Sequence, residues 1–376
     1  MGVKHSLFIL SKYFMISCGL WKIPFQKKSI RHIYSIYSYF PRAMLTLITA
    51  AMGIQAYVII TTVNETDKIF GTLTTLAIYF DMCFKLFFYL NNRLPQMFVD
   101  IIREEKKIQI TQDEQVKTIY LNQCNIYIQT SILQIVSTIF AAYFYIATNL
   151  FLFELTSSSF MYEMWMPFSI NWKILATFKI FFCQFGILIN SATHIGLQSL
   201  MIFAATHLKI LQINIDATFK NHSDNTHVHL KLGRIIKRHQ YLIKFVRNLN
   251  NSVKSVILLE FILNSVNLAA GMLQVITAQS VVEILFGLVY FFLLISQLFI
   301  LAWSADEINI QSFKVSNAIY ESNWMDQSES IKKMMLIMIM RAQKPLSLTI
   351  GSFRPMNLQA GIMTLKGAYT YAGVMR

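Results

Sequence analysis

The chain has 376 residues, of which 55% are hydrophobic and only 14% are charged. A soluble domain carries about a quarter charged residues, so this composition excludes a large soluble domain and favours one helical bundle in a membrane. The formal net charge of +14 would suggest nucleic-acid binding in a soluble protein. Here the basic residues lie between the apolar runs, so we expect membrane lipids, and no nucleic acid, as partners.

Seven apolar stretches are long enough to cross a bilayer core, which takes about 20 residues of helix. The predicted spans are 43–63, 69–90, 127–153, 173–206, 254–279, 281–303 and 356–375. The fourth is longer than a span needs, so its end is expected to continue as a helix into the cytosol. The fifth and sixth must form a helical hairpin, because their connection around Ser280 is very short. The predicted fold class is an all-α membrane protein with seven transmembrane helices.

Charge predicts the orientation, because lysine and arginine are retained on the cytosolic side of a membrane. The N-terminal segment and the second, fourth and sixth connections hold nearly all the basic residues, which places the N-terminus in the cytosol and the C-terminus outside. The sequon at Asn64 then lies outside and is a candidate glycosylation site. The expected segments are a cytosolic N-terminus at 1–42, spans one to four at 43–206, a cytosolic helical connection at 207–253, spans five and six at 254–303, cytosolic anchor helices at 304–355 and span seven at 356–376.

Four stretches in the C-terminal half resemble the insect odorant receptor family. They are His-Leu-Lys-Ile-Leu-Gln at 207–212, His239-Gln240 with the apolar positions that follow it, Ala-Ile-Tyr-Glu-Ser-Asn-Trp-Met-Asp at 318–326, and the run from Arg-Ala-Gln-Lys-Pro at 341–345 to Lys-Gly-Ala-Tyr-Thr-Tyr at 366–371. The inward N-terminus also resembles that family and is the reverse of a G-protein-coupled receptor.

The resemblance implies an odorant-binding subunit of a ligand-gated, non-selective cation channel. Such a subunit assembles with an odorant receptor co-receptor into a heterotetramer in the plasma membrane of olfactory sensory neurons. In this family odorants bind within the outer half of the bundle, among the second, third, fourth and sixth spans, and span seven lines the pore. Spans one to four of this chain are therefore the expected ligand-binding bundle. The ligand is then a small volatile organic molecule, and no cofactor, metal or enzymatic activity is implied.

A narrow stripe on span seven is the predicted pore face. Met363, Gly367, Thr370 and Val374 share one side of a helix at 100° per residue, and the stripe is uncharged, as a hydrophobic gate requires. Val374 matches the valine that narrows the co-receptor pore, and the next constricting residue would lie beyond Arg376. We therefore expect either a gate with fewer rings or a sequence that is short at its C-terminus. The alternative is that the stripe serves ordinary helix packing.

Aromatic side chains mark the predicted ligand site in the outer half of the bundle. The candidates on span three are Phe140, Tyr143, Phe144 and Ala147, and those on span four are Phe178, Phe181, Phe182 and Phe185. Burial of apolar surface at roughly 25 cal/mol per Å² would supply most of the affinity, and a hydroxyl such as that of Tyr143 or Tyr290 could orient a polar ligand. The alternative is helix–helix packing.

Asp81 and Lys85 stand one turn apart in span two, where each charge costs about 2.5–3.5 kcal/mol near the bilayer centre. Mutual pairing on one helix face would offset that cost, and a role in gating or ion conduction is the alternative.

Three other functions compete with this interpretation. A gustatory receptor of the same superfamily would fit Thr370-Tyr371, but Arg376 breaks the hydrophobic run that should follow and no Gln-Phe appears. A secondary transporter would favour inverted repeats and broken helices, which the sequence lacks. An enzyme is disfavoured because no nucleophile elbow or phosphate loop is present.

Overall fold

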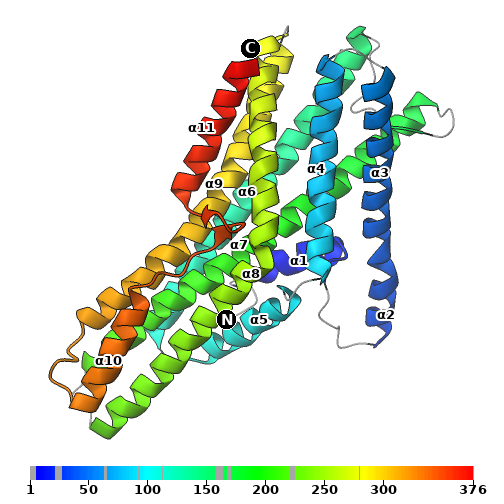
Figure 1. Ribbon diagram of the computed structural model, residues 1–376. Helices are drawn as coiled ribbons and strands as arrows, with labels where there is room; N and C mark the ends of the chain where they lie inside the picture. The colour runs from blue at the N-terminus through cyan, green and yellow to red at the C-terminus, as the bar shows by residue number, and fades with distance from the viewer. Residues whose placement is uncertain are drawn as a thin grey trace.

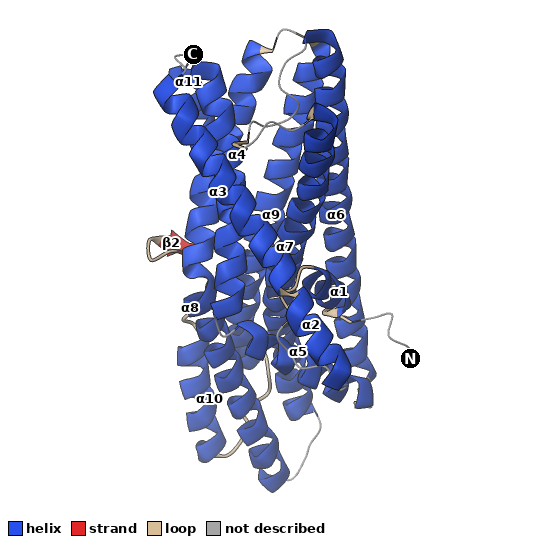
Figure 2. Cartoon of the chain, turned by 90° about the vertical axis from the view of Figure 1, so that its right-hand side faces the viewer, coloured by secondary structure: helices blue, strands red, loops and turns tan. Residues whose placement is uncertain are grey.

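The computed structural model describes residues 6–21, 28–62, 66–91, 94–111, 113–156, 164–166, 171–220, 225–278 and 280–375. Within these ranges the chain forms eleven α-helices and one short β-hairpin (Figures 1 and 2). In chain order they are α1 (Ile9–Ser17), α2 (Lys28–Tyr37), α3 (Tyr39–Thr62), α4 (Thr66–Asn91), α5 (Leu94–Ile110), α6 (Glu114–Thr156), α7 (Trp172–Lys220), α8 (Asn225–Thr277), α9 (Val281–Tyr320), α10 (Glu329–Ala342), β1 (Thr349–Ile350), β2 (Arg354–Pro355) and α11 (Leu358–Met375).

Four helices are much longer than a membrane is thick. The longest two, α7 and α8, have 49 and 53 residues. At 1.5 Å per residue a 49-residue helix is about 73 Å long, more than twice the bilayer's hydrocarbon core of about 30 Å. These helices therefore continue well beyond the membrane, where α10 packs against α9.

Six helical segments are apolar and long enough to cross a bilayer. They are Lys28–Thr62, Thr72–Leu90, Glu114–Leu150, Trp172–Phe219, His227–Leu273 and Val281–Tyr320. The seventh predicted span corresponds to α11, which is shorter and carries Lys366 and three glycines. The prediction of an all-α membrane protein is confirmed.

The central helix is α7, whose middle is buried on every side. From Ser191 to Leu208 each residue is buried, including Thr193, His194 and Gln198. A helix that is apolar on one stripe only would lie at the edge of the bundle. Here α7 contacts α1, α3, α4, α5, α6, α8 and α9, so its small and polar residues allow many neighbours to approach it closely.

The predicted hairpin between spans five and six is present. Ser280 caps α9, because its Oγ accepts a hydrogen bond from the backbone N–H of Glu283 at 3.2 Å. The two helices come close together at Gly287, where an added Cβ would meet Val275 Cγ2 at 2.5 Å. The hairpin is therefore closed by a helix cap and by a glycine.

The N-terminal segment is part of the bundle rather than a simple tail. Ser11 on α1 lies 2.6 Å from the Tyr127 hydroxyl and also hydrogen-bonds to the Ile195 carbonyl. Leu7 and Met15 are fully buried. The turn after α1 uses Gly19 at φ +71°, a conformation that favours glycine.

The β-hairpin ties the start of α11 to α8. The Gly351 N–H donates to the Lys254 carbonyl at 3.0 Å, and the Thr349 N–H donates to Asn250 Oδ1 at 2.8 Å. Gly351 has φ +59° and packs closely on Leu258. Consequently α8 determines where α11 begins.

Candidate functional site

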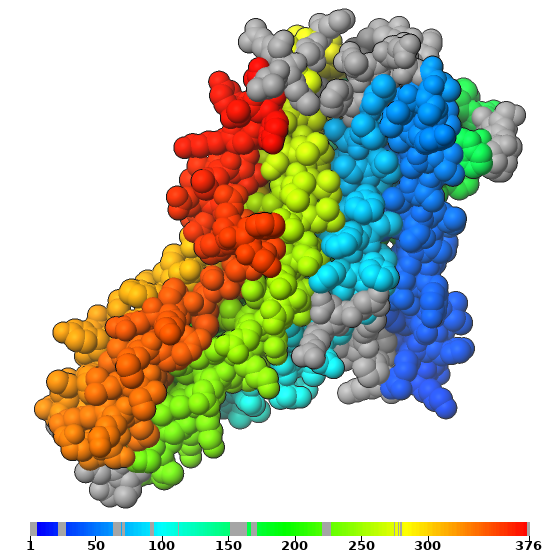
Figure 3. All heavy atoms as spheres, in the orientation of Figure 1, coloured from blue at the N-terminus to red at the C-terminus, as the bar shows by residue number. Residues whose placement is uncertain are grey.

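The last helix has two chemically different faces. Small residues cover its buried face, and they are Ala360, Thr364, Ala368 and Ala372. This face packs against α8 and α9, and short side chains allow helices to approach closely in a membrane. The surface of α11 lies open along one edge of the molecule (Figure 3).

The predicted pore stripe lies on the open face of α11. Met363 is 52% exposed, Thr370 is exposed, and an added Cβ at Gly367 would meet no atom within 4 Å. The backbone of Val374 belongs to α11, and its side chain lies outside the described residues. Since the stripe points away from this chain's own core, packing within the chain does not explain it.

Most members of the two predicted aromatic stripes lie on the surface of the bundle. Five of their members are exposed, and these are Phe140, Tyr143, Ala147, Phe178 and Phe181. Rings stack along each helix, as in the pairs Phe140–Phe144 and Phe178–Phe182, both with centroids 6.0 Å apart. No ring contact joins the two stripes among the described residues. Phe144, Phe182 and Phe185 are the partly buried members.

Tyr290 lies inside the bundle, beside two aromatic residues that sequence reasoning missed. Its ring stacks on Phe286 at 6.1 Å, and the Phe286 ring lies 5.3 Å from that of Tyr145. α8 passes close to this group at Gly271, where an added Cβ would lie in ordinary van der Waals contact with the Tyr290 ring at 3.7 Å. This group joins α6, α8 and α9. Tyr145 directly follows Phe144 of the predicted span-three stripe, but its ring points toward Phe286 on α9. This direction could not be read from the sequence.

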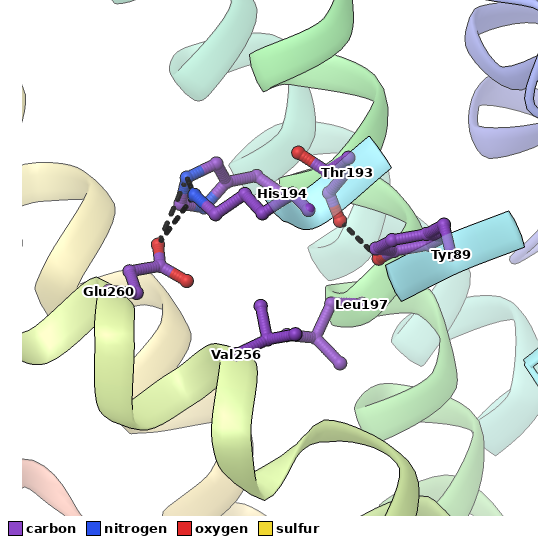
Figure 4. A pocket seen from close by; sticks show the side chains of 7 residues that line it. Tyr89, Thr193, His194, Leu197, Val256 and Glu260 are labelled. Carbon is purple, nitrogen blue, oxygen red and sulfur yellow. Dashed lines mark hydrogen bonds and ion pairs between the residues drawn. The ribbon is translucent and has the colours of Figure 1, made fainter. Parts of the chain in front are cut away.

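A cluster of buried charges joins three helices in the middle of the bundle (Figure 4). Lys85 Nζ on α4 lies 2.8 Å from Asp81 Oδ2 and 3.4 Å from Glu260 Oε1 on α8. His194 Nε2 on α7 lies 3.0 Å from the same Glu260 oxygen and 3.3 Å from Lys85 Nζ. The side chains of Lys85, His194 and Glu260 are each 4% exposed.

Asp81 and Lys85 therefore pair as the sequence predicts, but their partners on other helices were missed. Glu260 is the only carboxylate in the predicted fifth span, and a lone charge in a span signals a functional or paired site. That signal could have found it. His194 carried no such signal, because an isolated histidine in an apolar helix is usually a packed core residue.

The cluster is tightly packed and not a ligand pocket. The cavity beside it has a volume of about 10 Å³ and is lined partly by Tyr89, Leu197 and Val256, whereas small-molecule pockets are typically about 300–1,000 Å³. Tyr89 closes one side by donating to the Thr193 carbonyl at 2.6 Å. Among the described residues no group of three or more His, Cys, Asp or Glu side chains is arranged to hold a metal ion.

A second polar network lies where the helices leave the predicted membrane region. Arg238 on α8 contacts Glu104 Oε2 at 2.8 Å and His207 Nδ1 at 2.8 Å. Lys107 also contacts Glu104, at 2.7 Å. His207 opens the sequence stretch 207–212 singled out above, so this motif has a structural role in joining α5, α7 and α8.

The fold and these sites define a polytopic helical membrane protein with helices that extend far outside the bilayer and a final helix with an open, uncharged stripe. The sequence profile of the 7tm odorant receptor family matches residues 65–369. The chain belongs to this family of odorant receptors, and it is not an enzyme. This finding favours the predicted odorant receptor over the gustatory and transporter alternatives.

Known relatives and solved structures agree with this assignment. The chain is 30% identical over 181 residues to odorant receptor 10 of Aedes albopictus and 31% identical over 146 residues to odorant receptor Or2 of Anopheles gambiae. These matches span 47% and 39% of this chain and 48% and 39% of the relatives. The structure is similar to that of the olfactory receptor OR5 of Machilis hrabei in complex with eugenol, with a TM-score of 0.81, 18% sequence identity and coverage of 98% of this chain and 97% of that one. The fold is thus that of the insect olfactory receptors.

Proposed function

We propose that this odorant receptor is the ligand-binding subunit of a heteromeric, ligand-gated, non-selective cation channel. Its partner is the odorant receptor co-receptor, and its place is the plasma membrane of olfactory sensory neurons, with the N-terminus in the cytosol. The observation that carries the proposal is the open face of α11, which presents Met363, Gly367 and Thr370 away from the chain's own core.

A ring of such helices around one axis gives a pore without charges at its narrowest level. An apolar constriction can gate by losing its water. Lys366 is also exposed, and at 100° per residue it is 40° from Thr370 and 100° from Gly367, so it lies at one edge of the stripe. Packing of α11 through its alanine face on α8 and α9 holds the stripe toward the axis.

The proposed ligand is a small volatile organic molecule, of the size class of the eugenol bound to the related Machilis receptor. Of the predicted ligand residues, Phe144, Phe182, Phe185 and Tyr290 are partly buried, so these are the ones we assign to the pocket. Tyr290 supplies a hydroxyl that can orient a polar odorant. Apolar burial at roughly 25 cal/mol per Å² supplies most of the remaining affinity.

The test is odorant-evoked current in cells that express this chain with the co-receptor. We expect cation current with both chains and no odorant response from this chain alone.

To locate the pore, Thr370→Arg is compared with Tyr369→Arg, since both residues are exposed on α11 but stand 100° apart. A positive charge at position 370 should reduce cation current about tenfold or more, because a pore offers no counter-charge.

Tyr369→Arg is expected to change the current much less at equal surface expression. Equal loss in both variants would show that the stripe is not the pore face. Silence of the co-expressed wild-type chain across a broad odorant panel, with both chains at the surface, would contradict the proposed function itself.

A further inference from the structure

The charge cluster around Lys85 links helices that differ in their proposed roles. Lys85 belongs to α4 and His194 to α7, which are helices of the proposed ligand-binding bundle. Glu260 belongs to α8, which carries α11. The contact from Lys85 to Glu260 is therefore a bond between two functional parts of the chain, whereas the contact from Lys85 to Asp81 stays within α4.

The cluster can be rearranged only in discrete steps. A buried ion pair that loses one partner leaves an uncompensated charge in a medium of low dielectric constant, so α8 cannot slide gradually away from α4. His194 Nε2 reaches both a donor, Lys85 Nζ, and an acceptor, Glu260 Oε1. One ring nitrogen can accept from the first or donate to the second, but not both. Two hydrogen-bond arrangements are thus available at one site.

The other end of this connection is the base of α11. Glu260 stands six residues, about 9 Å along the helix, from Lys254, whose carbonyl accepts from the Gly351 N–H at 3.0 Å. Asn250, one turn further, holds Thr349. A shift of α8 at the level of Glu260 therefore moves the hairpin from which α11 starts.

We infer that the Lys85–Glu260 bridge, with His194, is the coupling element that transmits odorant occupancy of the bundle to the pore helix. This inference rests on the proposed channel function. Lys85, His194 and Glu260 act as positioning residues, because they lie in a packed cluster and line neither the pore stripe nor the assigned pocket. Removing the bridge should lower the efficacy of a bound odorant more than its affinity.

Two matched substitutions test this, each of which turns one carboxylate partner of Lys85 into an amide. Glu260→Gln removes the ion pair between helices, and Asp81→Asn removes the ion pair within α4. With the co-receptor present and surface levels equal, Glu260→Gln should lower the maximal odorant current about fivefold or more while shifting the half-maximal concentration less than about threefold. Asp81→Asn should change the maximal current less than about twofold.

Tyr290→Phe provides the opposite comparison, since substitution of a pocket residue should shift the half-maximal concentration more than it lowers the maximal current. If the wild-type chain gives odorant current and Glu260→Gln gives the same maximal current, the coupling role is overturned but the proposed channel function is not. Equal losses in Glu260→Gln and Asp81→Asn would also overturn the coupling role. Absence of any wild-type current would instead count against the proposed channel, and the coupling role would fall with it.

If Glu260→Gln does not reach the surface, the charges are exchanged by combining Lys85→Glu, Glu260→Lys and Asp81→Asn. This variant restores attraction between α4 and α8 with the polarity reversed. Recovery of both surface expression and odorant current supports the coupling role. Recovery of surface expression alone, or of neither, shows that the bridge does not transmit gating and overturns it.

Discussion

Glu105 is a buried carboxylate that holds the N-terminal segment against α5. It accepts hydrogen bonds from the Tyr120 hydroxyl and, at 2.8 Å, from Ser6 Oγ. Burial raises the pKa of the Glu105 carboxyl above its ordinary value of 4.5, and the hydrogen bonds from Tyr120 and Ser6 offset this only in part. The folded protein therefore binds this proton more tightly than the unfolded chain does. Its contribution to stability is present below pH 4.5 and is lost as the pH rises through the pKa of the folded state.

Glu105→Gln should remove this pH dependence. The melting temperature of the variant in detergent, relative to wild type, should rise as the pH increases from about 4.5 to about 7.5. Glu114→Gln is the matched comparison, because it makes the same change at a side chain that is 81% exposed. A constant difference for Glu105→Gln over this range would show that its carboxyl does not titrate differently in the folded protein.

At the scale of elements, the hairpin of α8 and α9 depends on one glycine contact. A Cβ at Gly287 would meet Val275 Cγ2 at 2.5 Å, and valine has little rotamer freedom with which to move away. Gly287→Ala should therefore destabilise the folded protein by about 1–3 kcal/mol, as overpacking does. The measurement is the melting temperature of the purified chain in detergent.

Gly53→Ala is the control for this substitution, since Gly53 lies on α3 and an added Cβ there meets nothing within 4 Å. Val275→Ala combined with Gly287→Ala should recover most of the lost stability, because it removes the clashing methyl group. If Gly287→Ala and Gly53→Ala have the same melting temperature, α8 and α9 do not pack tightly against each other at Gly287.

Long helices were predictable from sequence, whereas their contacts with one another were not. Apolar runs of membrane length set the spans, and the short connection at Ser280 required a hairpin. The burial of α1 against Tyr127 and Ile195 could not be anticipated, because the N-terminal segment has no membrane-length apolar run. Likewise, helical periodicity pairs Asp81 with Lys85 four residues on, but it carries no information on Glu260, which lies 175 residues away in sequence. Contacts between distant helices depend on helix rotation and depth, and composition leaves both undetermined.

For the whole molecule, the orientation in the membrane is the property on which the channel proposal depends. The basic connections predict that Asn64, which lies outside the described residues, is extracellular, and that the sequon at Asn221, also outside them, is cytosolic. An N-glycosidase should therefore increase the gel mobility of the wild-type chain. The shift should disappear in Asn64→Gln and persist in Asn221→Gln. An acceptor site inserted between the end of α6 at Thr156 and the start of α7 at Trp172 should also be glycosylated, since the same argument places that connection outside. Glycans at Asn221, or no glycan at the inserted site, would show that the bundle has the opposite orientation, with the C-terminal end of α11 in the cytosol.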